Sequence, residues 1–268
     1  MTRALSAIIL RELVRMFRQR GRLVSAMIRP LIWLLVIGTG FQSLVGDAMG
    51  ADYHQFLVPG LLAMVLLFGS MLASLSLVYD KESGVMRMLV MAPFPHYWIV
   101  LARTLSAAIA GLLQALLLLL ILLPMGYVPH LPDIPLLLTG LVLAAFTCAS
   151  LGMLIAVFSR TLDNFAVIMN FVIFPVFFLS GALYPLQKLP LEFIWLAQAN
   201  PFTYAVDLLK HALLGQQQGV MSADLGIGLD ITVMLGFNLL ALTIAALRFS
   251  RTPVIESLAR VLSQGSRR

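Results

Sequence analysis

Six long stretches of this chain contain no Asp, Glu, Lys or Arg residue. They are Pro30 to Gly46, Tyr53 to Tyr79, Thr104 to Pro132, Ile134 to Ser159, Asn164 to Gln187 and Ile231 to Leu247. Each can hold a helix of roughly 17–25 residues, the length that crosses the hydrocarbon core of a bilayer. Because that core offers no water to backbone polar groups, these groups must be satisfied inside helices. The pattern therefore predicts an all-α membrane protein with six transmembrane helices.

The predicted spans form one domain that covers residues 1–268, since no internal repeat or low-complexity linker divides the chain. Their bounds are residues 30–46, 56–79, 98–123, 136–158, 165–184 and 229–247. Composition agrees, because 11% of the residues are charged, against roughly 25% in soluble domains. A soluble protein of this length could not bury six such stretches.

The basic residues predict the orientation of these spans. Seven Arg residues precede the first span, and six crossings would return the C-terminus to the same side. Sixteen of the 18 Lys and Arg residues then lie on that side, and only Lys188 and Lys210 lie on the other. This bias indicates that both termini are cytoplasmic. It also explains the net charge of +6 without a nucleic-acid partner.

Two segments outside the spans have the character of interfacial helices. Leu5 to Val24 places Arg11, Arg15, Arg18 and Arg22 on one face, which predicts an amphipathic helix on the lipid surface. Between spans 5 and 6, Leu191 to Ala199 is apolar but too short to cross a bilayer. We expect it to form an interfacial or re-entrant helix.

Two short sequences mark where further helices begin or end. Asn200 followed by Pro201 predicts a helix start, because Asn caps helix N-termini and Pro is tolerated in the first turn. After the second span, charged residues lead into a short apolar run that Pro93 and Pro95 terminate. Such a run is costly in water and needs a protein partner, although Met86 and its neighbours could instead lie on lipid.

The sequence lacks the patterns of nucleotide-hydrolysing and metal-dependent enzymes. None of the three lysines follows a glycine, so the phosphate-binding G-x-x-x-x-G-K-[ST] pattern is absent. The four histidines are scattered without the spacing of metal ligands, and Cys148 is the only cysteine. We therefore expect no catalytic residue, no bound metal and no directly bound cofactor.

The polar groups predicted within the membrane are amides and hydroxyls: Gln42, Gln114, Asn170, Asn238, Thr147 and Ser150. We expect these groups to form hydrogen bonds between helices. Transporters driven by protons or sodium usually hold ionisable groups at this depth. The absence of carboxylates from the six stretches therefore weighs against that class.

Three segments, in this order and spacing, resemble the membrane subunit of the ABC type-2 exporter family, the permeases of ATP-binding-cassette drug, polysaccharide and lipid exporters. They are Glu82-Ser83-Gly84-Val85-Met86-Arg87-Met88-Leu89, Phe178-Leu179-Ser180-Gly181-Ala182-Leu183-Tyr184-Pro185 and Asn200-Pro201-Phe202-Thr203-Tyr204-Ala205-Val206-Asp207. The resemblance covers almost the whole chain and implies a bacterial plasma or inner membrane location.

The resemblance also implies roles for these residues. Glu82 to Leu89 would be the coupling helix that docks on a separate ATP-binding-cassette ATPase subunit. Ser180, Gly181, Tyr184, Pro185, Asn200 and Pro201 would belong to an outer re-entrant gate. The permease would work as a dimer with two ATPase subunits, which use ATP and Mg, and spans 1, 2 and 5 would line the pathway.

Two other functions remain open at this point. A secondary transporter or channel would need no ATPase partner and would respond to the proton gradient. An assembly scaffold or intramembrane enzyme would act without moving a cargo. The family resemblance leaves the cargo open among drugs, lipids and polysaccharides, and leaves open whether the permease pairs with itself or with a paralogue.

Overall fold

The computed structural model describes residues 30–43, 53–85, 96–128, 132–215 and 223–265, together with four single positions before residue 30. Within these ranges the chain is helical and has no strand, which confirms the all-α class. The elements in chain order are η1 (Trp33–Gly38), α4 (Tyr53–Glu82), α6 (His96–Leu122), α7 (Ile134–Phe158), α8 (Leu162–Phe178), η2 (Leu186–Lys188), α9 (Leu191–Ala199), α10 (Pro201–Leu214) and α11 (Ile227–Gly265). The predicted amphipathic helix Leu5 to Val24 lies almost wholly outside the described residues.

Four of the described helices are long and apolar enough to cross a membrane, which identifies an integral membrane protein. They are α4, Tyr97–Leu122 of α6, α7, and Ile227–Ser250 of α11. Two shorter apolar helices are Pro30–Ser43, which contains η1, and α8. With 17 residues, α8 is about 26 Å long, somewhat less than the roughly 30 Å of a bilayer core. Six complete spans therefore stay a prediction.

Two predicted helix ends are wrong. The fifth span was expected to reach Tyr184, but α8 ends at Phe178 because the chain turns at Gly181, whose φ is +75°. The sixth helix was expected to end with its span at Leu247; the apolar span ends close by, at Ser250, but α11 itself continues to Gly265. Charged residues that stop a membrane span do not stop a helix, because a helix can continue in water.

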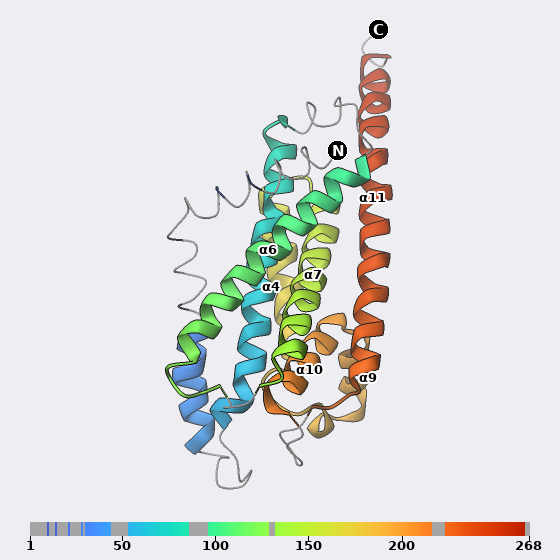
Figure 1. Ribbon diagram of the computed structural model, residues 1–268. Coiled ribbons are helices and arrows are strands. Elements are labelled where there is room, and N and C mark those ends of the chain that lie inside the picture. The colour runs from blue at the N-terminus through green and yellow to red at the C-terminus, as the bar shows by residue number, and fades with distance from the viewer. Residues whose placement is uncertain are drawn as a thin grey trace.

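Helix α4 forms the centre of the bundle. It packs against α6, α7, α8 and α10, while α11 covers α7 and leaves much of its own surface exposed. Figure 1 shows the two ends of this bundle. We call the end where α4 finishes and α6 begins the coupling end, and the end that carries α9 and α10 the hairpin end.

Small and polar residues join the helices within the bundle. Gly69 of α4 approaches α6 so closely that an added Cβ would lie 3.2 Å from the Cα of Gly111. Asn238 of α11 donates a hydrogen bond to the hydroxyl of Thr147 in α7 over 3.2 Å. The prediction that amides and hydroxyls join neighbouring helices is thus confirmed for this pair.

Candidate functional site

The predicted coupling segment begins where α4 ends, and four of its eight residues lie within the described part of the chain. Glu82 is the last residue of α4, and Gly84 follows with a φ of +79°. The amide of Ser83 still donates to the carbonyl of Tyr79 over 2.9 Å. Gly84 therefore ends the helix in a left-handed conformation that side chains disfavour. Val85 is exposed, and Met86, Arg87, Met88 and Leu89 lie outside the described residues.

The last turn of α4 holds the connection between α7 and α8. Lys81 Nζ donates to the carbonyl oxygens of Ala156 and Val157 over 2.8 Å each, and to that of Ser159 over 3.2 Å. An ammonium group at this position satisfies the carbonyls that a helix C-terminus leaves unpaired. Lys81 therefore fastens α4 to the C-terminal end of α7.

Glu82 makes the matching contact with α8. Its Oε2 atom accepts a hydrogen bond from the amide of Leu162 over 3.1 Å, at the first residue of that helix. A carboxylate is favourable there because a helix N-terminus carries partial positive charge. Lys81 and Glu82 together tie the C-terminal end of α4 to both sides of the α7–α8 connection.

A buried ion pair lies next to this junction. Arg103 of α6 pairs with Asp80 of α4, and its Nη1 also donates to the hydroxyl of Ser76 over 3.0 Å. The Arg103 side chain is 2% exposed and that of Asp80 is 6% exposed. Arg103 can lie inside the bundle because α4 supplies a carboxylate.

At the hairpin end, the predicted gate residues form a turn that packs on α4. The hydroxyl of Ser180 donates to the carbonyl of Phe177 over 2.7 Å, and the hydroxyl of Tyr184 donates to the carbonyl of Phe178. Tyr53, the first residue of α4, donates its hydroxyl proton to the carbonyl of Leu183 over 2.8 Å. Pro185 then leads into η2. The structure therefore places four of the six predicted gate residues in one turn.

The other two predicted gate residues join this turn to α10. Asn200 caps α10 by accepting a hydrogen bond from the amide of Phe202 over 3.1 Å, and Pro201 is the first residue of that helix. The Nδ2 group of Asn200 donates to the carbonyl of Val176 in α8 over 2.7 Å. The predicted N-cap is thus confirmed, and Asn200 also satisfies a carbonyl at the end of α8.

The turn from Ser180 to Pro185, which we call the gate turn, approaches α4 closely at Gly60. A side chain at position 60 should displace this turn. An added Cβ would collide with the backbone carbonyl of Ala182, which cannot move as a flexible side chain could. We expect Gly60→Ala to lower the free energy of unfolding by about 1–3 kcal/mol, the usual cost of overpacking. Thermal unfolding of the purified protein measures this effect. Gly236→Ala is the control, since a Cβ there meets nothing within 4 Å. Equal loss in both variants would contradict the close approach.

A group of charged residues lies beneath the gate turn. Lys210 of α10 is 1% exposed and donates to Asp224 Oδ2 over 2.9 Å. The same Nζ lies 4.9 Å from the centre of the Phe56 ring in α4, a favourable cation–π contact. Asp224 Oδ1 accepts from the amide of Leu186 over 3.1 Å. This ion pair therefore links α10, α4, η2 and the segment before α11.

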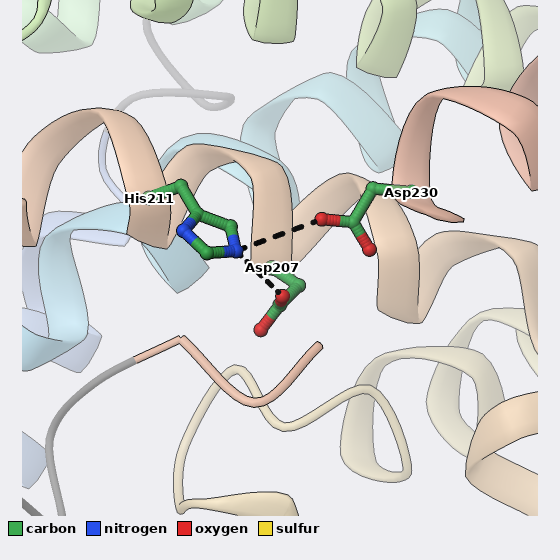
Figure 2. A group of neighbouring side chains, drawn as sticks. All are labelled: Asp207, His211 and Asp230. Carbon is green, nitrogen blue, oxygen red and sulfur yellow. Dashed lines mark ion pairs between the residues drawn. The ribbon is translucent and has the colours of Figure 1, made fainter. Parts of the chain in front are cut away.

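Near Lys210, three more titratable side chains converge, two from α10 and one from α11. Figure 2 shows Asp207 and His211 of α10 facing Asp230 of α11. His211 Nε2 lies 3.5 Å from Asp207 Oδ2 and 4.0 Å from Asp230 Oδ2. The ligand atoms of all three residues lie within 4.8 Å of one another. This arrangement can hold a cation or share a proton.

Asp207 is oriented by the segment before α11. Its Oδ1 accepts from the amide of Asp224 over 2.6 Å and its Oδ2 from the amide of Leu225 over 3.0 Å. Burial raises the pKa of the Asp207 carboxyl above its ordinary value, while these two amides and Lys210 act in the opposite direction. The carboxyl group is held rigidly, and its charged form is costly without a positive partner.

The buried carboxylates are what the sequence reasoning missed. Asp207 was quoted only within a family segment, His211 was counted as a scattered histidine, and Asp230 fell one residue before the sixth charge-free stretch. The spacing of Asp207 and His211 was the available signal, since residues four apart share one face of a helix. Asp230 joins them through tertiary packing alone.

The sequence of this chain is similar to those of known transport permeases. Residues 3–214 match the family model described as ABC-2 type transporter. Nodulation protein J of Rhizobium leguminosarum bv. trifolii is 27% identical over 203 residues, which cover 72% of this chain and 74% of that protein. The inner membrane transport permease YadH of Escherichia coli (strain K12) is 28% identical over 195 residues, which cover 72% and 75%.

A further relative is the putative transport permease ycf38 of Cyanophora paradoxa, which is 25% identical over 212 residues that cover 77% of this chain and 72% of that protein. The family model includes the coupling segment, the gate turn and α10, because its match runs to Leu214, the last residue of that helix. The match ends before Asp224 and Asp230. Two of the five titratable residues at the hairpin end therefore lie beyond the matched region.

Proposed function

The chain belongs to the ABC-2 type transporter family, and we propose that it forms the transmembrane pathway of an ATP-driven exporter whose ATP is hydrolysed by a separate cassette subunit. Membership makes it a membrane permease subunit of an ABC transporter. We further propose that the permease exports its cargo and is coupled to the ATPase. We also propose that it lies in an inner membrane with both termini cytoplasmic, and that two copies form a homodimer.

The observation that carries this proposal is the pair of contacts made by Lys81 and Glu82. Both residues stand at the start of the proposed coupling helix, and both bind the α7–α8 connection. A force applied to the coupling segment would reach α8 directly through them. ATP binding can drive the permease only if the two ATPase states bind the two permease states with different affinity. The contacts of Lys81 and Glu82 offer a path by which a change at the ATPase would reach α8.

Exposed side chains suggest where the pathway lies. Helix α8 exposes Val167, Phe171 and Phe174, and the neighbouring helix Pro30–Ser43 exposes Val36. The two helices are joined by an edge-to-face contact between Trp33 and Phe177, with ring centres 5.9 Å apart. We place the pathway and the contact with a second copy along these two helices, the predicted spans 1 and 5.

Span 2 was expected to line the pathway with spans 1 and 5, but the position of α4 favours a different role. Helix α4 is enclosed by α6, α7, α8 and α10. A helix that is covered on most sides by its own chain has little surface left to line a channel between two copies. We therefore assign α4 to transmission, because it runs from the coupling segment to the gate turn.

A transporter driven by an ion gradient is the second candidate, and two buried carboxylates speak in its favour. The charge-free stretches argued against it, but Asp207 and Asp230 are buried together at the hairpin end. Intramembrane carboxylates are the residues that proton-coupled transporters use. What favours the ATP-driven function is the family match and the geometry of the coupling end.

The first test is purification of the tagged protein from its native membrane in mild detergent, followed by mass spectrometry of the bound proteins. The proposal requires a stoichiometric subunit with a phosphate-binding loop. Recovery of the permease alone, with transport that depends on the proton gradient after reconstitution, would instead establish the ion-driven candidate.

The coupling junction predicts a second result. Glu82→Ala removes the hydrogen bond to the amide of Leu162 at the start of α8, and Gly84→Pro is incompatible with a φ of +79°. We expect both variants to insert normally and to lower permease-dependent ATP hydrolysis by the complex several-fold. Asp163→Asn, an exposed acidic residue in the first turn of α8, is the control. Normal ATP hydrolysis in both coupling variants would reject the assigned role.

A further inference from the structure

Asp230 poses a specific electrostatic problem. Its side chain is fully buried, with an exposed fraction of 0%. Neither of its carboxylate oxygens has a hydrogen-bond partner among the residues that the structure describes. A buried carboxylate without such partners is strongly unfavourable unless a proton or a cation neutralises it. The carboxylate faces Asp207 and His211, so the missing positive charge belongs in that space (Figure 2).

The formal charges of the group define the size of this deficit. Asp207, Asp224 and Asp230 contribute three negative charges, and Lys210 contributes one positive charge. With all three carboxyl groups ionised and the imidazole neutral, the group would carry two excess negative charges. Lys210 is engaged by Asp224 over 2.9 Å, so it does not neutralise Asp230. A single divalent cation would balance the group.

The donor atoms have the spacing of a coordination shell. For tetrahedral metal bonds of about 2.1 Å, neighbouring ligand atoms stand about 3.4 Å apart. His211 Nε2 lies 3.5 Å from Asp207 Oδ2 and 4.0 Å from Asp230 Oδ2. In the structure this nitrogen donates its proton to the carbonyl oxygen of Leu225 over 2.9 Å. A bound metal would replace that proton, and the carbonyl oxygen could then serve as a fourth donor.

The surroundings also hold the proposed ligands in place. The amides of Asp224 and Leu225 fix both oxygens of Asp207, as outer-shell hydrogen bonds do around metal sites. Asp207 and His211 are four residues apart on α10, and Asp230 lies in the first turn of α11. The site would therefore join α10 to the start of α11.

We propose that Asp207, His211 and Asp230 bind one divalent transition-metal cation of the Zn²⁺ class, with the carbonyl of Leu225 as an additional ligand. Two carboxylates and one imidazole suit ions of this class, because imidazole favours Zn²⁺ and its neighbours while Ca²⁺ and Mg²⁺ prefer oxygen alone. Bound metal would fasten α10 to α11 and so hold the hairpin end closed. The inference does not depend on what the chain transports.

The test uses the full-length chain in detergent, purified without a polyhistidine tag and stripped with a chelator. Zn²⁺ alone is titrated by calorimetry, and Co²⁺ alone is followed by its visible absorption, which reports the ligand set. We expect one equivalent of Zn²⁺ to bind. Saturating Zn²⁺ should raise the midpoint of thermal unfolding by at least about 5 °C.

Asp230→Asn is the decisive variant. The amide keeps the shape of the side chain, and no hydrogen bond to the carboxylate is lost, so the metal-free variant should be as stable as the metal-free wild type or more so. Its affinity for Zn²⁺ should fall by more than the roughly 10- to 100-fold that loss of an outer-shell partner costs. Its Co²⁺ absorption should disappear.

Two further variants keep the test decisive if Asp230→Asn does not fold. His211→Gln changes a side chain that is 22% exposed and should weaken Zn²⁺ binding in the same way. Glu192→Gln, an exposed acidic residue on α9, is the matched control and should bind like the wild type. Unchanged Zn²⁺ affinity in both site variants, or no saturable binding by the wild type, would overturn the proposal. In the second case a proton and a charged imidazole balance the group instead.

Discussion

A Lys210→Met variant should have a free energy of unfolding about 3–5 kcal/mol below that of the wild type, the usual cost of removing one partner of a buried ion pair. Methionine keeps most of the volume of the side chain but removes its charge. The carboxylate of Asp224, which is 3% exposed, would then stay buried without its ammonium partner. The contact with the ring of Phe56 would also lose its electrostatic part.

Chemical unfolding of the purified protein in mixed micelles measures this loss. Lys188→Met is the matched control, because Lys188 lies in the adjacent η2 and its side chain is exposed. Surface substitutions of this kind usually change stability by no more than about 0.5 kcal/mol. A similar loss in both variants would show that positive charge at the hairpin end matters in general, and that the pair itself does not.

The double variant Lys210→Met with Asp224→Asn tests whether the loss of stability comes from the broken ion pair or from each side chain separately. Asparagine retains an oxygen that can accept from the amide of Leu186, as Asp224 Oδ1 does over 3.1 Å. Replacing both members of a buried pair is often nearly neutral. We therefore expect the double variant to regain most of the stability that Lys210→Met loses. Additive losses would contradict a direct interaction between the two side chains.

The helical spans could be predicted because one property determines them. A stretch without charge that is long enough to cross a bilayer has few alternatives to a helix. Helices α4, α6 and α7 therefore begin and end within a few residues of the predicted bounds. The N-cap at Asn200 was equally accessible, because capping depends on neighbouring residues alone.

Helix ends and buried charges depend on contacts that the local sequence does not contain. Helix α8 ends six residues before the predicted limit, since the turn through Gly181 packs on α4 near Gly60. Arg103 and Lys210 were treated as surface charges. Each is buried because another segment supplies a carboxylate, Asp80 for the first and Asp224 for the second.

The candidate site was predicted in part for the same reason. The order of the three family segments pointed to the two ends of α4, since each segment lies within continuous sequence, and their coupling and gate roles stay predictions. The group formed by Asp207, His211 and Asp230 combines two helices with a segment between them. Only the spacing of Asp207 and His211 was visible beforehand, and one such pair is frequent in helices without a ligand.

At the coupling end, an Arg103→Met variant should lose a similar amount of stability, about 3–5 kcal/mol, and should also impair coupling. It leaves Asp80 buried in the bundle and removes the hydrogen bond to the hydroxyl of Ser76. Asp80 directly precedes Lys81 and Glu82, which hold the α7–α8 connection. A buried carboxylate that has lost its guanidinium partner would draw water to the last turn of α4 and loosen that junction.

Stability and coupling can be measured on the same preparation, by chemical unfolding and by ATP hydrolysis of the complex with its ATPase subunit. Arg160→Met is the control, because Arg160 lies at the same end of the bundle and is exposed. Asp80→Asn combined with Arg103→Met should recover most of the stability, since no uncompensated charge then remains. If the double variant is stable but hydrolyses ATP as poorly as Arg103→Met, the pair serves coupling as well as folding. Full recovery of both quantities would assign it to folding alone, and Lys81 with Glu82 would then be sufficient to transmit the movement.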